Sequence, residues 1–178
     1  MAILKIIKRL NNILAKICYL VIIIYVLICI PYIFGYHPLV VLTGSMEPTY
    51  KIGSIIYYHK VPENELKIGD PITFNLSNGT IVTHRINDIV DNEYQTKGDA
   101  NDTPDVVKIS YNNILGRVSN IVIPLVGYGI VFIKSHKYFI GIAIFILVSE
   151  LALNSVLAFD INKKRKEEKN GRTWKKAC

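Results

Sequence analysis

Two long apolar runs, one near each end of the chain, enclose a middle part in which apolar and polar positions are mixed. The first run, Ile17 to Phe34, has eighteen residues and no charge. A helix of that length, at about 1.5 Å per residue, crosses most of a hydrocarbon core roughly 30 Å thick. The second run, Tyr138 to Phe159, contains Glu150, which must be neutral, paired or near the interface if it lies in lipid. The pattern predicts transmembrane helices over residues 17–36 and 138–159.

A cleaved signal peptide is the alternative for the first run. The apolar region of a signal peptide is about 7–15 residues long and ends in a small-residue cleavage site. Here the run is longer and ends in Ile30-Pro31-Tyr32, without such a site. The residues therefore favour a retained anchor, with Tyr32 and Tyr36 at the water boundary, where aromatic residues gather.

The middle part has the pattern of short strands. Ser77-Asn78-Gly79 is a hairpin signal between two of them, and Asp91-Asn92 marks a second hairpin. Turn residues interrupt the segment about every 8–12 residues, as in small all-β domains. We expect a mainly β fold, a small antiparallel β-domain over residues 37–137 flanked by the two transmembrane helices. The predicted strands lie within Gly53–His59, Pro71–Leu76, Thr80–Ile86 and Ile89–Thr96.

A third apolar run, Ile121 to Ile133, is too short to cross a membrane. Pro124, Gly127 and Gly129 interrupt it. The run, residues 121–133, is expected either to lie on the membrane surface or to complete the core of the β-domain.

The net charge of +7 is distributed unevenly along the chain. Four Lys/Arg and no acid precede the first run, and the residues after Phe159 carry a net charge of +5. The middle, from Tyr36 to Tyr138, has nine Lys/Arg against ten Asp/Glu. Because basic flanks of membrane helices stay in the cytoplasm, residues 1–16 and 160–178 are expected inside and the β-domain outside. The basic residues flank apolar segments and form no patch in a domain, which argues against nucleic-acid binding.

Cysteine usage narrows the chemistry. Cys18 and Cys29 lie in the first apolar run and Cys178 is the last residue. The middle part has no cysteine, so it holds no disulfide, no thiol nucleophile and no thiolate ligand. Cysteine-based transpeptidases are thereby excluded, and we expect no metal and no cofactor.

Three polar clusters in the middle part carry residue types used in catalysis. They are Thr43–Thr49 with Ser45, Thr83–Arg85 with His84, and Lys97–Asp105 with three acids. Serine is a weak nucleophile until a base removes its proton. Histidine serves as that base near neutral pH, and a carboxylate fixes its tautomer. Since such residues occur in most domains, their spacing alone leaves open a purely structural role.

The order of the clusters between two apolar runs resembles the type I signal peptidases, in particular the subclass of the endoplasmic reticulum, archaea and some Gram-positive bacteria. That subclass has a histidine where the larger bacterial subclass has a lysine. The resemblance covers the chain from about Ile17 to Ile161. The matching segments are Ser45-Met46-Glu47-Pro48-Thr49, Thr83-His84-Arg85, Lys97-Gly98-Asp99-Ala100-Asn101, Gly116-Arg117-Val118 and Ile123-Pro124-Leu125-Val126-Gly127.

The resemblance implies a role for each matching site residue. Ser45 is the expected nucleophile and His84 the expected general base. The acid that orients His84 is Asp99 or Asp105, and the sequence leaves that choice open. The hydroxyl of Thr43 is expected to help form the oxyanion hole, together with the backbone N–H of Ser45.

The function implied by the resemblance is that of a membrane-bound serine endopeptidase, signal peptidase I. It cleaves signal peptides from exported preproteins after a small-x-small motif, through an acyl-enzyme. The expected partners are these signal peptides and membrane lipid, with the secretion translocon as a further candidate. The expected location is the plasma membrane, with the endoplasmic reticulum membrane as the alternative. The competing functions are a non-catalytic membrane-tethered binding or assembly module and a serine peptidase with another membrane substrate.

Overall fold

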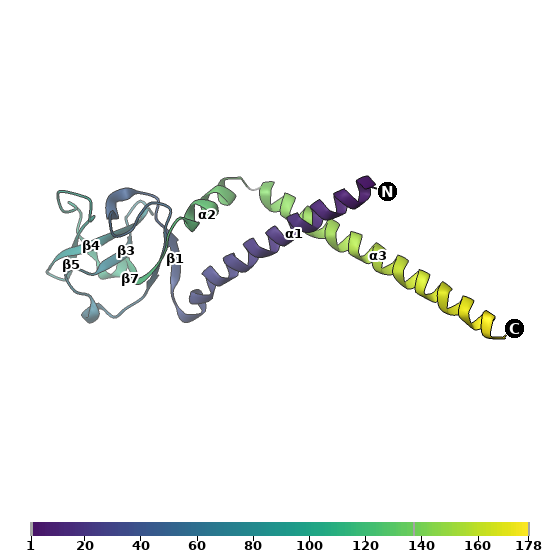
Figure 1. Ribbon diagram of the computed structural model, residues 1–178. Coiled ribbons are helices and arrows are strands. Elements are labelled where there is room, and N and C mark those ends of the chain that lie inside the picture. The colour runs from purple at the N-terminus through teal and green to yellow at the C-terminus, as the bar shows by residue number, and fades with distance from the viewer. Residues whose placement is uncertain (1, 137, 178) are drawn as a thin grey trace. The chain divides into compact units, whose positions relative to one another are not determined.

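The computed structural model describes residues 2–136 and 138–177. The chain divides into two compact units, a β-rich unit formed by Val26–Ser135 and a helical unit formed by the residues on either side of it. The helices of the described part are α1 (Ala2–Cys29), α2 (Val126–Ser135) and α3 (Tyr138–Ala177). Helix α2 directly follows β7 along the chain (Figure 1), and its residues lie within the β-rich unit.

Two helices in the described part are long and apolar enough to cross a membrane, over Ile6–Phe34 and Tyr138–Val156. Nearly all their large apolar side chains are exposed, as expected of helices that face lipid. Within the helical unit, the Ser149 hydroxyl donates a hydrogen bond to Asn11 Oδ1 at 2.9 Å. The two apolar helices are as the sequence predicts, and the residue limits of their membrane segments stay predictions.

Both helices extend beyond the apolar runs. The α1 helix begins at Ala2, before the predicted start at Ile17, and α3 continues through the basic tail to Ala177. Lys, Glu and Arg are good helix formers, so a helix that has already nucleated propagates through such residues. At its far end α1 passes at Ile30 into a 3₁₀ helix that holds Pro31 and ends at Gly35, whose φ of 80° favours glycine.

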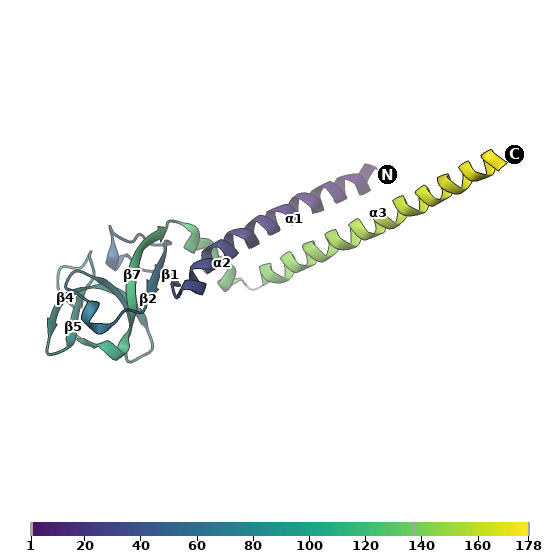
Figure 2. The same cartoon turned by 90° about the horizontal axis from the view of Figure 1, so that it is seen from below.

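Seven strands of the β-rich unit form one antiparallel sheet in the order β1-β2-β7-β3-β4-β5-β6, which confirms the predicted fold class. In both views β4 and β5 lie at the far side of this unit from β1 (Figures 1 and 2). The strands are β1 (His37–Val40), β2 (Ile55–His59), β3 (Pro71–Asn75), β4 (Ile81–Val90), β5 (Glu93–Lys97), β6 (Ile109–Ser110) and β7 (Ile114–Ile123).

Both predicted hairpins are confirmed. The β3–β4 hairpin pairs Asn75 with Ile81, and Gly79 has a φ of 81° in the turn between them. The β4–β5 hairpin turns through Asp91 and Asn92, whose φ values are 55° and 59°. Two successive residues with positive φ match the right-handed twist of the strands, and Asp and Asn tolerate this conformation better than other side chains.

Strands β1, β6 and β7 and helix α2 were not predicted. Strand β7 lies between β2 and β3, in the interior of the sheet. The third apolar run contributes the end of β7 and most of α2. Ile123, Val126 and Ile130 from this run pack against the buried Ile55 and Tyr57. Part of the run therefore packs on the core, whereas Leu125 (71% exposed) and Tyr128 (53% exposed) of the same run are not buried, and both alternatives for residues 121–133 stay predictions.

The sheet buries different clusters on its two faces. One cluster includes Ile72 and Phe74 of β3 and Ile86 of β4. A second joins Met46 and Tyr50, which follow β1, to β2 and β7. Each cluster removes apolar surface from water, which is the main source of stability in a domain of this size.

The end of α1 is part of the β-rich unit. Ile28 is 6% exposed and packs against Ile55 and Tyr57. The buried Tyr57 hydroxyl donates a hydrogen bond to the Ile28 carbonyl oxygen at 2.9 Å. This bond satisfies a carbonyl near the helix terminus and joins the sheet to the last turn of the helix.

We predict that Gly116→Ala destabilises the protein and that Gly129→Ala does not. A Cβ at position 116 would lie 2.3 Å from the backbone oxygen of His59, so β7 would have to move away from β2. Such overpacking costs about 2 kcal/mol. A Cβ at position 129, within α2, meets nothing within 4 Å, and alanine favours a helix interior by up to about 1 kcal/mol. Denaturant unfolding of the detergent-solubilised chain, followed by circular dichroism, measures both; equal stability of the two variants would contradict the close β2–β7 approach.

Candidate active site

Ser45 lies in a single 3₁₀ turn, Gly44–Met46, between β1 and β2. Met46 (2% exposed) and Tyr50 (6% exposed) anchor the segment in the core. The Ser45 carbonyl oxygen accepts a hydrogen bond from the backbone N–H of Ala100 at 2.9 Å. The buried side chains and this hydrogen bond hold the turn in place, and the Ser45 side chain remains partly accessible.

His84 lies on β4, directly opposite Ile72 of β3. Its residue exposure is 9%, and its ring meets the Phe74 ring edge-on, with 6.4 Å between the centroids. The turn that carries Ser45 packs against the same strand. A rigid strand and an aromatic neighbour therefore fix the imidazole beside the serine segment.

Asp105 is the acid that contacts the histidine. Its Oδ2 lies 2.6 Å from Nδ1 of His84. The same oxygen accepts a hydrogen bond from the Thr96 hydroxyl at 2.6 Å, and the Asp105 N–H donates to the Thr96 carbonyl oxygen at 2.7 Å. A carboxylate at Nδ1 favours the tautomer that carries its proton there, which leaves Nε2 free to accept a proton.

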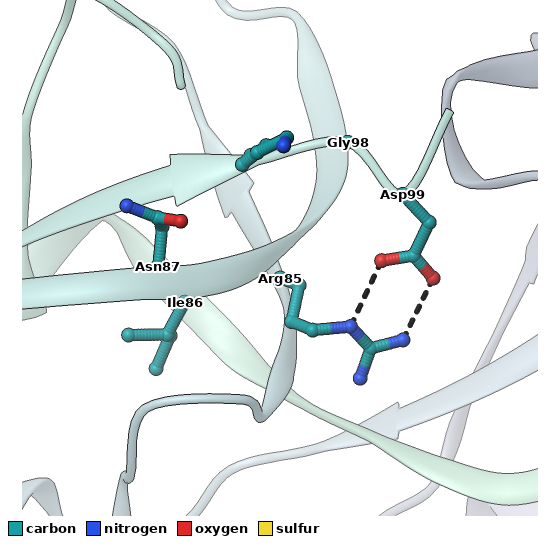
Figure 3. Close-up of a pocket in the computed structure, with 6 residues that line it drawn as sticks. Arg85, Ile86, Asn87, Gly98 and Asp99 are labelled. Carbon is teal, nitrogen blue, oxygen red and sulfur yellow. Dashed lines mark hydrogen bonds and ion pairs between the residues drawn. The ribbon is translucent and has the colours of Figure 1, made fainter. Parts of the chain in front are cut away.

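Asp99 has different partners. Nε and Nη2 of Arg85 donate to its two oxygens at 2.8 and 2.7 Å (Figure 3), and the Thr49 hydroxyl donates to Oδ2 at 2.5 Å. The hydrogen bonds from Arg85 are the main reason that the pKa of Asp99 lies below its usual range, and the bond from Thr49 acts in the same direction. The Arg85 guanidinium also donates from Nη1 to the carbonyl oxygen of Gly69 at 2.7 Å. Asp99 therefore joins the serine segment to the histidine strand.

The structure brings most of the predicted site residues together. Thr43 Oγ1 lies 3.5 Å from Ser45 Oγ, at the limit of a hydrogen bond. In the described part of the chain the Ser45 hydroxyl is not hydrogen-bonded to His84. Catalytic hydrogen bonds are often long before substrate binds. Asp102, the third acid of its loop, is exposed to solvent.

Sequence reasoning missed Thr96. It is fully buried, at 0% exposure, and holds the Asp105 carboxylate in place. The signal was the alternation of residues, because Tyr94 and Thr96 of β5 and Gly98 directly after it are buried and the intervening Gln95 and Lys97 are half-buried. Gly98 is also required sterically, since a Cβ there would lie 2.6 Å from the Ser45 carbonyl oxygen.

Comparison with known proteins identifies relatives. No family model matches the chain. Over 130 residues the chain is 36% identical to signal peptidase I W of Bacillus subtilis (strain 168), an alignment that covers 66% of this chain and 68% of that protein. It is 32% identical over 113 residues to the signal peptidase complex catalytic subunit SEC11 of Lodderomyces elongisporus and 34% identical over 113 residues to that of Candida tropicalis. Each of these two alignments covers 56% of this chain and 67% of the relative. At these identities and coverages, the chain belongs to the type I signal peptidase family.

Proposed function

We propose that this membrane protein is a serine endopeptidase that removes signal peptides from exported preproteins. The observation that carries the proposal is the 2.6 Å contact of His84 Nδ1 with Asp105, on a strand that packs against the Ser45 turn. This arrangement supplies a nucleophile, a base and an orienting carboxylate. The relatives named as signal peptidases support the choice of substrate class.

In the proposed reaction, Nε2 of His84 accepts the Ser45 hydroxyl proton as Oγ attacks the carbonyl carbon that precedes the scissile bond. The His84 imidazolium then gives that proton to the leaving nitrogen, the C–N bond breaks, and an acyl-enzyme remains on Ser45. Water, deprotonated by His84, attacks the ester and releases the signal peptide. The first step requires Ser45 Oγ to come within hydrogen-bond reach of Nε2 when the substrate binds.

The two acids have separate roles in this proposal. Asp105 orients His84 and stabilises the imidazolium, which its hydrogen bond to Nδ1 supports. Asp99 is a positioning residue, because its partners Arg85 and Thr49 belong to the strand of His84 and the segment of Ser45. Thr43, with its hydroxyl near Ser45 Oγ, is the candidate second donor of the oxyanion hole.

The open edge of β4 supports substrate binding as an added strand. Strand β4 pairs with β3 over Ile81–Arg85 and with β5 over Arg85–Val90. In the described part of the chain, the edge of Ile81–His84 that faces away from β3 therefore has no strand partner. An extended peptide on this edge obtains main-chain hydrogen bonds and reaches the site at His84.

Membrane attachment suits this substrate. An exported precursor holds its apolar segment in the bilayer, so an enzyme confined there meets it at a raised effective concentration. The excess of Lys and Arg beyond both apolar helices supports cytoplasmic termini and an external β-domain. We propose signal peptides and lipid as the partners, the translocon as a further one, and the plasma membrane as the location.

We predict that Ser45→Ala and His84→Ala each abolish precursor processing, because each removes a group that forms or breaks bonds. The expected fall in kcat is about a thousandfold or more. The measurement is the conversion of a radiolabelled precursor by the full chain in liposomes. Ser77→Ala, in the exposed β3–β4 turn, is the matched control and should cleave at the wild-type rate. Processing by Ser45→Ala at the rate of Ser77→Ala would rule out the peptidase.

We predict unequal effects for the two acids. Asp105→Asn should lower kcat about a thousandfold at neutral pH, because an amide in place of the carboxylate favours the wrong imidazole tautomer. Asp99→Asn should lower kcat by about tenfold, because it loosens the link between the two catalytic segments. Single-turnover cleavage assays give both values. A larger loss for Asp99→Asn than for Asp105→Asn would reverse the proposed roles.

We predict that Asp99 contributes to stability in a pH-dependent way. Its pKa is lowered in the folded state, so its contribution is fully present above the unfolded pKa of about 3.9 and is lost as pH falls through the folded value. Wild type should exceed Asp99→Asn by about 2 kcal/mol at neutral pH, and this gap should shrink below about pH 4. Thermal unfolding across pH measures the gap, and a gap that does not change with pH would contradict the prediction.

A further inference from the structure

Ser45 lies in a loop whose two ends are joined by backbone hydrogen bonds. This serine loop, residues 41–54, connects β1 to β2. The Val41 N–H donates to the Ser54 carbonyl oxygen, and the Gly53 N–H donates to the Val41 carbonyl oxygen, both at 2.9 Å. The position of Ser45 therefore depends in part on the conformation of the loop base, which Val41, Gly53 and Ser54 form.

The start of α2 packs on this base. The pairing of Ile55 in β2 with Ile123 in β7 places the chain that follows β7 beside the loop. There the Gly127 N–H donates a hydrogen bond to the Gly53 carbonyl oxygen at 2.9 Å. The Tyr128 ring lies against Gly53, since a Cβ at that glycine would lie 2.1 to 2.5 Å from three ring carbons. One hydrogen bond and one aromatic ring thus hold the loop base from the side of α2.

Two glycines make this close contact possible. Gly53 has a φ of 79°, which favours glycine, and its missing side chain leaves room for the Tyr128 ring. A Cβ at Gly127 would lie 2.7 Å from the Gly53 carbonyl oxygen and 2.7 Å from Cγ1 of Val40. Gly127 ends the last segment that resembles the signal peptidases, and the proposed mechanism gives this segment no role. Its contact with the serine loop supplies one.

The backbone that leads into α2 is strained. Leu125 has a φ of 65°, a conformation that is unfavourable for a bulky side chain. Its side chain is 71% exposed, so burial of that side chain does not offset the cost. Strained residues persist where the surrounding structure holds them, and they gather at functional sites. The contacts that hold this turn are those of Val126 with the core and of Gly127 with Gly53.

On this basis, and resting on the proposed function, we propose that Tyr128 is a positioning residue for Ser45. The ring fixes Gly53, and the residue before it, Ile52, lies beside the glycine that precedes Ser45. A Cβ at that glycine, Gly44, would lie 3.8 Å from Cδ1 of Ile52, an ordinary packing distance. A movement of the loop base therefore reaches the turn of the nucleophile through one side chain.

The effect of Tyr128 is on kcat. Ser45 Oγ must come within reach of His84 Nε2 when the substrate binds, and a displacement of about 1 Å can cost about a hundredfold in rate. The core cluster that anchors the loop is built from other side chains. Without the ring, the loop stays attached but its base is free to shift. Asp105 and His84 belong to other segments, so the pH dependence that this pair sets does not change.

The test measures kcat and KM for precursor cleavage by the full chain in detergent micelles, per folded molecule as judged by circular dichroism. Tyr128→Ala should lower kcat about tenfold, change KM by less than about twofold, and leave the pH of half-maximal rate at the wild-type value. Tyr128→Phe keeps the ring, so it should keep at least about half of the wild-type kcat. Phe34→Ala, which removes an exposed aromatic side chain from the 3₁₀ helix after α1, is the matched control and should cleave at the wild-type rate.

The inference is overturned if Tyr128→Ala keeps the wild-type kcat per folded molecule, or if it raises KM with kcat unchanged. It is also overturned if Tyr128→Phe or Phe34→Ala loses as much activity as Tyr128→Ala, or if the pH profile of Tyr128→Ala moves. All these results leave the proposed function intact. That function fails separately, if wild type cleaves no precursor or if Ser45→Ala cleaves it as fast as wild type.

Discussion

Strand β4 lies between β3 and β5, and its two pairings are offset along the strand. It pairs with β3 up to Arg85 on one edge and with β5 from Arg85 onward on the other edge. The arrangement of the site depends on this offset. The chain that leaves β5 at Lys97 is then free to form the loop that carries Asp99 and Asp105 back over β4. One edge of β4 stays open next to His84, where a sheet with a longer β5 would have covered it. Backbone hydrogen bonds of the open edge are therefore available to a peptide.

Two carboxylates six residues apart in one loop are given different chemistry by their surroundings. Asp99 meets a guanidinium and a hydroxyl, which stabilise its charged form and bind it into the scaffold. Asp105 meets an imidazole and the buried hydroxyl of Thr96. The role of each carboxylate follows from the group that it contacts, because that group sets its charge state and its hydrogen bonds. Asp99 links Arg85 of β4 to Thr49, which lies 50 residues before Asp99 in the sequence. Such a link preserves geometry at a site that tolerates little displacement.

The β-rich unit also includes the last turn of the first apolar helix. Ile28 is buried against Ile55 and Tyr57, and the Tyr57 hydroxyl bonds to the Ile28 carbonyl oxygen. A flexible linker would let a tethered domain drift from the surface that anchors it. Here the contacts are direct, because the residues at the end of α1 pack on the sheet within the β-rich unit.

By itself, the sequence determined the two apolar helices, the two hairpins and the segments that carry Ser45, His84 and the acids. These are local features, because length, alternation and turn residues act over a few neighbouring positions. It did not reveal β7, an interior strand of the sheet, whose Gly116 interrupts the apolar alternation to let the His59 backbone approach. Nor did it choose between Asp99 and Asp105. That choice depends on which side chains from β4 reach the loop, and only the pairing of β4 with its two neighbours decided it. The contact of Tyr128 with Gly53 is likewise tertiary, because the serine loop and α2 meet only when the sheet places β2 beside β7.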